Sequence, residues 1–396
     1  MKQAANANGL RIAGGRSLMG GRFVEAPITL TPQGTIGEAG SRANGRCVDA
    51  TGLLVLPGIV DIHGDAFERQ MMPRPGVHFA LDLALLESDR QAVSNGITTV
   101  FHGVTWSWEP GLRNSENARS LLATIERLRS ELAADTRFHL RHETYNLDAE
   151  EEIVGWLAQR RIDVLAFNDH MTVAVEARRR PRSYATMVER SGVSREEFDG
   201  VVERVRQRRD EVPASIARLA AAATLNGVAL LSHDDASPAQ RQWYRSLGCR
   251  VAEFPTTLET AQEAAASGDD IVFGAPNVVR GGSHTGWTDA REMIARGLCS
   301  VLASDYYYPA PLLAAFRLVT SGTLALEQAW ALVSEAPARA VGLGDRGRIA
   351  PGQRGDLVLV DASNHDRPRL VATIARGRVV YLNQAERLER AGSIGE

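Results

Sequence analysis

The sequence contains little cysteine, almost no lysine and no long hydrophobic run. Its three cysteines, Cys47, Cys249 and Cys299, lie far apart and form no CxxC pair, which argues against a disulfide framework and a cysteine-based metal site. No stretch is long enough to span a bilayer and no early apolar run has a basic flank, so we expect neither membrane insertion nor export. A protein of the reducing cytoplasm fits these absences best.

Lys2 is the only lysine among 45 basic residues, so nearly every fixed positive charge is an arginine. A genome rich in G and C would produce this bias, but the bias also constrains the chemistry. Proteins that bind two metal ions in a β/α barrel often bridge the ions with a carbamylated lysine, and this chain has no lysine after Lys2. If two ions bind, the bridge must be a native carboxylate. Arginine is also the better ligand for phosphate, because its planar group donates paired hydrogen bonds.

The length and the pattern of the chain ends indicate two structural units. A chain of 396 residues suits a barrel of about 250 residues with a smaller domain. Short alternating segments at residues 22–25, 46–49, 357–361 and 370–381 read as small strands. We predict an α/β protein in which residues 1–55 and 344–396 form one β-sandwich and residues 56–343 form a (β/α)8 barrel. The net charge of −3 gives no reason to expect nucleic acid as a partner.

Several apolar runs end in residues that are able to bind metal ions. The first, residues 56–65 (LPGIVDIHGD), ends with His63 and Asp65 two positions apart, so in a strand both side chains point to the same side. Such runs are typical of strands buried on both faces of a parallel sheet, and in a barrel all strands end at one common face. We therefore expect convergence with the residues that end four later runs, which are Glu143, His170, His233 and Asp305.

These six residues predict a site for one or two divalent ions. Imidazole nitrogens and carboxylate oxygens suit zinc, with manganese or iron as alternatives. Two ions about 3.5 to 4 Å apart would share a hydroxide and activate it at neutral pH. Glu143 is the candidate bridge, and Asp305 would bind one ion and accept the proton of the attacking water. We expect His102, His139, His142 and Asp234 to pack or to orient ligands rather than to bind metal.

Longer motifs give the chain a family resemblance. Residues 57–63 (PGIVDIH) and 303–305 (ASD), with the sandwich split across both termini, resemble the amidohydrolase superfamily. A second set resembles, within that superfamily, the diphosphatases of phosphonate breakdown: MPRPGV at 72–77, GITTV at 96–100, SHDD at 232–235, AEFPTT at 252–257, GAPNVVRGGSH at 274–284 and SDYY at 304–307. The resemblance covers most of the chain. One departure lies after the first motif. In this chain His63-Gly64-Asp65 is followed by Ala66, whereas the HTD motif of the family is followed by asparagine.

This resemblance implies a metal-dependent hydrolase that removes pyrophosphate from α-D-ribose 1-methylphosphonate 5-triphosphate and leaves the 5-phosphate for a carbon–phosphorus lyase. Arginines would bind this phosphorylated sugar: Arg280 beside flexible glycines, and Arg69 and Arg74 after the first barrel strand. His284 would protonate the leaving pyrophosphate. We also expect a homo-oligomer that works together with other enzymes of the phosphonate pathway.

Two other functions are compatible with parts of the sequence. One is hydrolysis of a C–N bond in an N-acyl or cyclic amide substrate, which an arginine-lined mouth would oppose. The other is a non-catalytic scaffold, which the complete set of ligands opposes.

The strand count raises a separate question, because the paired histidines of the superfamily usually follow the fifth and sixth strands. His170 follows the fourth predicted strand, so either two strands are merged in the count or His170 is not a ligand.

Overall fold

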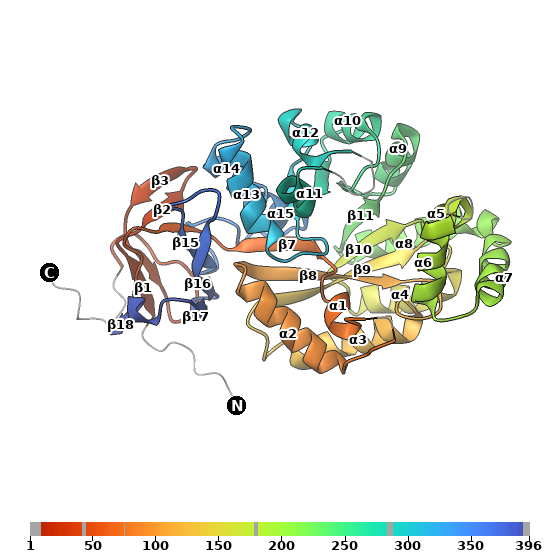
Figure 1. Cartoon of the computed structure of the whole chain (residues 1–396), viewed down its shortest axis with the longest axis horizontal. Helices are drawn as coiled ribbons and strands as arrows, with labels where there is room; N and C mark the ends of the chain where they lie inside the picture. Colours follow the sequence, from red (N-terminus) through yellow and green to blue (C-terminus); the bar gives the residue numbers. More distant parts are fainter. Residues whose placement is uncertain (1–8, 42–44, 75, 178–180, 283–287, 391–396) are drawn as a thin grey trace.

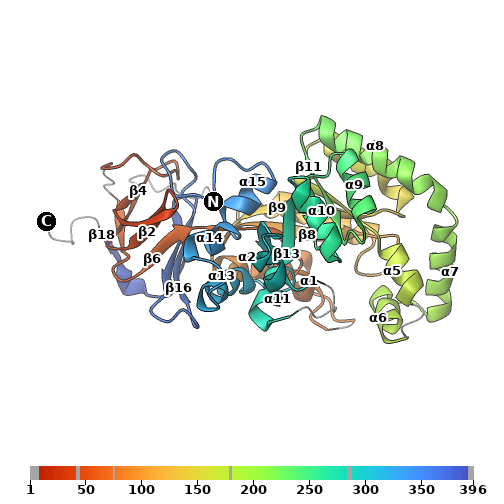
Figure 2. The same ribbon diagram turned by 90° about the horizontal axis from the view of Figure 1, so that it is seen from above.

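The computed structural model describes residues 9–41, 45–74, 76–177, 181–282 and 288–390. The molecule has two parts set side by side along its longest axis (Figure 1). A barrel surrounded by helices forms the larger part, and a module of two sheets forms the smaller one. A view turned by 90° shows the same separation, with α5 to α7 at the end remote from the sheet module (Figure 2).

The described residues include eight parallel strands that follow one another around a barrel in sequence order. The ring closes after the last strand, where the amide of Asp305 donates to the carbonyl of His63 at 2.9 Å and the amide of Asp65 donates to the carbonyl of Asp305 at 3.0 Å. Nearly all strand residues are buried, which explains their continuous apolar character. The strands are β7 (Ile59–Gly64), β8 (Ile97–Trp106), β9 (Asp135–Glu143), β10 (Val164–Asn168), β11 (Ala229–His233), β12 (Val251–Glu253), β13 (Asp270–Gly274) and β14 (Val301–Ala303).

Helices alternate with the strands and cover the outside of the barrel (Figure 1). Helices α5, α6 and α7 form an insertion between β10 and β11 with a small core of its own around Tyr184 and Phe198. None of the helices in the described ranges has both the length and the apolar character needed to cross a membrane. The helices are α1 (Glu68–Met71), α2 (Leu81–Val93), α3 (Ser115–Leu128), α4 (Glu150–Ala158), α5 (His170–Ala177), α6 (Pro181–Ser191), α7 (Arg195–Arg206), α8 (Val212–Leu225), α9 (Pro238–Ser246), α10 (Leu258–Ala266), α11 (Ala275–Arg280), α12 (Ala290–Ala295), α13 (Ala310–Thr320), α14 (Leu326–Ala331) and α15 (Glu335–Ala340).

Strands from both ends of the chain build the sheet module. One sheet has the order β18-β5-β1-β4 and the other the order β17-β16-β15-β6-β2-β3. Residues of both sheets share one core, for example Leu10, Leu30, Val55 and Leu357. The predicted barrel with a small sheet domain from both termini is confirmed. The strands are β1 (Leu10–Ala13), β2 (Arg16–Met19), β3 (Arg22–Glu25), β4 (Ile28–Leu30), β5 (Arg46–Asp49), β6 (Leu54–Pro57), β15 (Leu357–Asp361), β16 (Arg369–Ala375), β17 (Arg378–Leu382) and β18 (Leu388–Arg390).

Asp135 connects the start of a barrel strand to the segment that leads into β15. Its carboxylate accepts hydrogen bonds from Arg346 at 2.5 Å and from Arg354 at 3.0 Å. Burial would raise the pKa of Asp135, but the charges of Arg137, Arg346 and Arg354 outweigh it and lower this pKa to about 2. Asp135 is the first residue of β9, so this contact lies at the end of the barrel opposite to the C-terminal ends of the strands.

Candidate metal centre and active site

The predicted ligands surround an open pocket of about 290 Å³ at the C-terminal ends of the barrel strands. Of the six residues, the pocket is lined by His63, Asp65, His170, His233 and Asp305. Glu143 ends β9 and contacts His170. The convergence expected from the strand ends is therefore present in the fold, although the six residues form more than one cluster.

Left-handed backbone conformations gather at this face of the barrel. Asp234, Phe254 and Asp305 follow β11, β12 and β14 and have φ angles of 59°, 53° and 53°. This region costs a residue with a side chain about 1 to 3 kcal/mol, and such outliers cluster at active sites and ligand sites. All three residues line the pocket, so the strained backbone and the candidate ligands occupy one place.

His63, Asp65 and Asp305 form the first cluster able to hold a metal ion, with ligand atoms within 4.8 Å of one another. Burial, followed by the charge of Asp65, raises the pKa of Asp305 to about 8. Burial also raises the pKa of Asp65, with a further contribution from Glu68. Two carboxylates held this close repel each other unless a cation or a proton lies between them. One imidazole and two carboxylates fit zinc, manganese or iron.

Gly64 allows the first strand to approach the last one closely at this cluster. It pairs with Asp305 in a parallel bridge. A Cβ atom at position 64 would lie 2.7 Å from Oδ2 of Asp61 and 3.2 Å from Oγ of Ser304. Because the Asp61 carboxylate is fully buried and hydrogen-bonded to Ser304, it has little freedom to move away. Glycine between His63 and Asp65 is therefore explained by packing.

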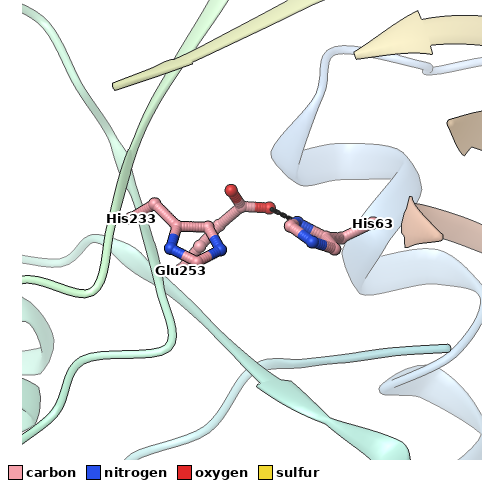
Figure 3. A group of neighbouring side chains, drawn as sticks. All are labelled: His63, His233 and Glu253. Atoms are coloured by element: carbon pink, nitrogen blue, oxygen red, sulfur yellow. Dashed lines mark hydrogen bonds and ion pairs between the residues drawn. The ribbon is translucent and has the colours of Figure 1, made fainter. Parts of the chain in front are cut away.

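His63, His233 and Glu253 form the second cluster, shown in Figure 3. Nδ1 of His63 lies 3.0 Å from Oε1 of Glu253, and both side chains are almost completely buried. When Nδ1–H of an imidazole donates to a carboxylate, Nε2 keeps its lone pair for a metal ion. Glu253 therefore orients His63 toward the first cluster. A role for Glu253 is not predictable from the local sequence pattern, because β12 is only three residues long.

Glu143 and His170 form a separate pair. Nδ1 of His170 lies 2.6 Å from Oε1 of Glu143, and the amide of His170 donates to Oε2 at 2.9 Å. Burial would raise the pKa of Glu143, but His170 outweighs it and lowers this pKa to about 2. His170 begins α5 directly after β10, the fourth barrel strand, so the strand count is confirmed. A ligand role for these two residues stays a prediction.

Two arginines outside the predicted set, Arg141 and Arg113, also line the pocket. The side chain of Arg141 is 5% exposed and lies on β9. Its Nη2 lies 3.2 Å from Nε2 of His233, and its Nη1 lies 3.7 Å from Oδ2 of Asp65. Arg113 donates two hydrogen bonds to Glu68, at 3.2 and 3.1 Å. The pocket thus contains fixed positive charge beside its carboxylates.

Two further arginines contact Tyr306, which follows the pocket residue Asp305 in the chain. Arg280 is exposed and its Nη1 donates to the hydroxyl of Tyr306 at 3.4 Å. The guanidinium of Arg69 lies 5.7 Å from the ring centre of Tyr306, within the range of a cation–π contact. Arg280 ends helix α11, and Gly281 caps the helix with a φ of 87°, so Arg280 belongs to a helix end rather than to a flexible loop.

The remaining predicted residues are Arg74, expected to bind the substrate, and His284, expected to protonate the leaving group. Arg74 is exposed in the segment after α1, where its backbone pairs with Val77. His284 lies outside the described residues. Their assigned roles therefore stay predictions.

Comparisons with known proteins agree with this fold. A model of the amidohydrolase family matches residues 201–381. The α-D-ribose 1-methylphosphonate 5-triphosphate diphosphatase of Escherichia coli (strain K12) is 34% identical over 326 residues, which cover 79% of this chain and 84% of that enzyme.

Solved structures with a similar fold include three hydrolases. An amidohydrolase has a TM-score of 0.64 at 15% identity, with 95% of this chain and 99% of that chain covered. The dihydropyrimidinase of Brevibacillus agri NCHU1002 has a TM-score of 0.60 at 13% identity, with 95% of each chain covered. The D-hydantoinase of Bacillus sp. AR9 has a TM-score of 0.62 at 15% identity, with 94% and 95% covered. At such identities these structures bear on the fold alone.

Proposed function

The chain belongs to the amidohydrolase superfamily, and we propose that it is a metal-dependent hydrolase that removes pyrophosphate from α-D-ribose 1-methylphosphonate 5-triphosphate. The observation that carries this proposal is the grouping of His63, Asp65 and Asp305, which could hold a cation, in a pocket that also contains a buried arginine. The name of the Escherichia coli relative supports this substrate. Cytoplasmic location, a homo-oligomer and association with other phosphonate-pathway enzymes stay predictions.

His63, Asp65 and Asp305 would hold the divalent ion, which is zinc or, as alternatives, manganese or iron. A bound ion of this kind polarises a phosphoryl oxygen and makes a water molecule acidic enough to attack at neutral pH. Asp305 lines the pocket beside Asp65, where its carboxylate accepts the proton of the attacking water. Glu253 holds Nδ1 of His63, so that the imidazole keeps its orientation.

The arginines at the site would supply the positive charge that a polyphosphate substrate requires. A triphosphate carries several negative charges, and guanidinium groups bind phosphate oxygens through paired hydrogen bonds. Arg141 lies inside the pocket, while Arg280 and Arg69 both contact Tyr306. In this proposal Arg280, Arg69 and the neighbouring Arg74 hold the outer phosphates. His284 donates a proton to the leaving pyrophosphate.

Phosphorus NMR of the reaction tests this proposal. The metal-loaded protein is incubated with ribose 1-methylphosphonate 5-triphosphate and, in parallel, with nucleoside triphosphates. Hydantoin and an N-acyl amino acid are tested in the same way, with proton NMR as the readout. We expect pyrophosphate from the ribose triphosphate and slower or no release from the nucleotides. Turnover of the hydantoin or the N-acyl substrate without pyrophosphate release would replace the proposal by C–N bond hydrolysis.

A further inference from the structure

Arg141 lies between residues that were predicted to bind metal. Its guanidinium lies 3.2 Å from Nε2 of His233 through Nη2 and 3.7 Å from Oδ2 of Asp65 through Nη1. The side chain is 5% exposed, so water cannot easily replace these contacts. Any second metal ion near His233 would therefore meet a positive charge that is already in place.

The Arg141 contact occupies the nitrogen that His233 would need for metal binding. A guanidinium has only donors, so Nε2 of His233 must accept through its lone pair. The other nitrogen, Nδ1, lies 3.0 Å from Oδ2 of Asp234 but forms no hydrogen bond within the described residues. Nε2 of His233 is thus engaged by Arg141, while Nδ1 faces a carboxylate. His63 differs, because its Nδ1 pairs with Glu253 and its Nε2 remains available.

The carboxylate expected to bridge two ions is engaged as well. One oxygen of Glu143 lies 2.6 Å from Nδ1 of His170, and the other accepts the amide of His170 at 2.9 Å. Neither residue belongs to a candidate metal cluster within the described ranges. A second ion would have to break this pair in addition to displacing Arg141.

We propose that Arg141 takes the place of a second metal ion, so that the chain binds one ion through His63, Asp65 and Asp305. The inference deepens the proposed function and rests on it only in assuming a metal-dependent enzyme. The guanidinium supplies the positive charge beside Asp65. Nε of Arg141 is buried and has no hydrogen-bond partner in the described part of the chain, so the group still has a donor to offer a phosphate oxygen.

Metal content without substrate is the direct test. Protein stripped with a chelator is equilibrated with excess zinc, freed of unbound metal and analysed by mass spectrometry of the elements. The parent and three variants are compared: Arg141→Met, His233→Ala and, as the matched control, Arg113→Met. Arg113 lines the same pocket but pairs with Glu68. We expect about one ion per chain in the parent, in His233→Ala and in Arg113→Met, and about two in Arg141→Met.

Several outcomes would overturn the inference. Two ions in the parent would do so directly, and loss of the ion from His233→Ala would show that His233 is a ligand. A folded Arg141→Met that still binds one ion, or an Arg113→Met that binds two, would remove the specific role of Arg141. Should Arg141→Met not fold, the parent and His233→Ala still decide. A parent with one ion that releases no pyrophosphate would refute the proposed substrate and leave this inference intact.

Discussion

Replacing Glu253 by glutamine tests whether a buried carboxylate holds His63 ready for metal binding. The substitution keeps the size of the side chain and one accepting oxygen, but it removes the negative charge opposite Nδ1 of His63. The two atoms lie 3.0 Å apart and the side chains are 1% and 0% exposed. Because solvent does not reach the pair, water cannot take over the role of the missing charge.

The expected effect is a weaker affinity for the ion. Loss of such a partner of a metal-binding histidine costs about 10- to 100-fold in affinity, which corresponds to about 1.4 to 2.7 kcal/mol. We expect a loss near the lower limit of this range, about tenfold. A hydrogen bond to a charged group exceeds a neutral one by about 1 to 1.5 kcal/mol, and glutamine retains the neutral bond.

Competition with a fluorescent zinc chelator measures this affinity, and circular dichroism checks that each variant folds. Asp235→Asn is the matched control, because Asp235 is also a buried carboxylate but pairs with Arg241 at 3.0 Å rather than with a histidine of the site. Its affinity for zinc should match that of the parent. An unchanged affinity in Glu253→Gln, or an equal loss in Asp235→Asn, would refute the reasoning.

The remaining predictions concern turnover, phosphate binding and stability. Asp305→Asn keeps an oxygen donor but loses basicity, so turnover should fall about 10²- to 10⁴-fold with a much smaller loss of metal; near-normal steady-state turnover would exclude the role. Arg280→Lys should lower kcat/KM for the triphosphate at least about tenfold, because lysine cannot form the paired hydrogen bonds; kinetics equal to the parent would count against phosphate binding. Asp135→Asn should lower the free energy of unfolding near neutral pH by about 2 kcal/mol, because the folded pKa of about 2 lies below the ordinary 3.8. This lowered pKa stabilises the fold above about pH 4 and the effect disappears as the pH falls toward 2, so urea titrations of parent and variant should converge there; a difference independent of pH would contradict the assignment.

The barrel and its ligand-bearing face could be predicted from the sequence because the strands carry a strong local signal. In residues 59–65, a buried run of apolar residues is followed by His63 and Asp65 at a spacing of two, which is the period of a strand. Parallel strands with covered faces repeat this pattern along the chain. Convergence of His63, Asp65, His170, His233 and Asp305 on one pocket followed from this topology.

The partners within the site could not be predicted in the same way. Glu253 lies on a strand of three residues, which is too short for a recognisable period, and its partner His63 is 190 positions away. Arg141 stands in the segment RFHLRHE (137–143), where an arginine suggests a solvated charge rather than a buried one. Which carboxylate pairs with which imidazole depends on side-chain packing across the barrel, and sequence spacing carries no information about it.

The closure of the barrel has a consequence for how the protein folds and unfolds. The hydrogen bonds that join the last strand segment to the first are made by the backbone of His63, Asp65 and Asp305, the same residues that form the cation cluster. An ion bound there is a cross-link across the seam of the ring, and separation of the seam breaks its coordination. Metal loading should therefore slow hydrogen exchange at the amides of Asp65 and Asp305 and raise the melting temperature, because ligand binding to the folded state alone stabilises that state.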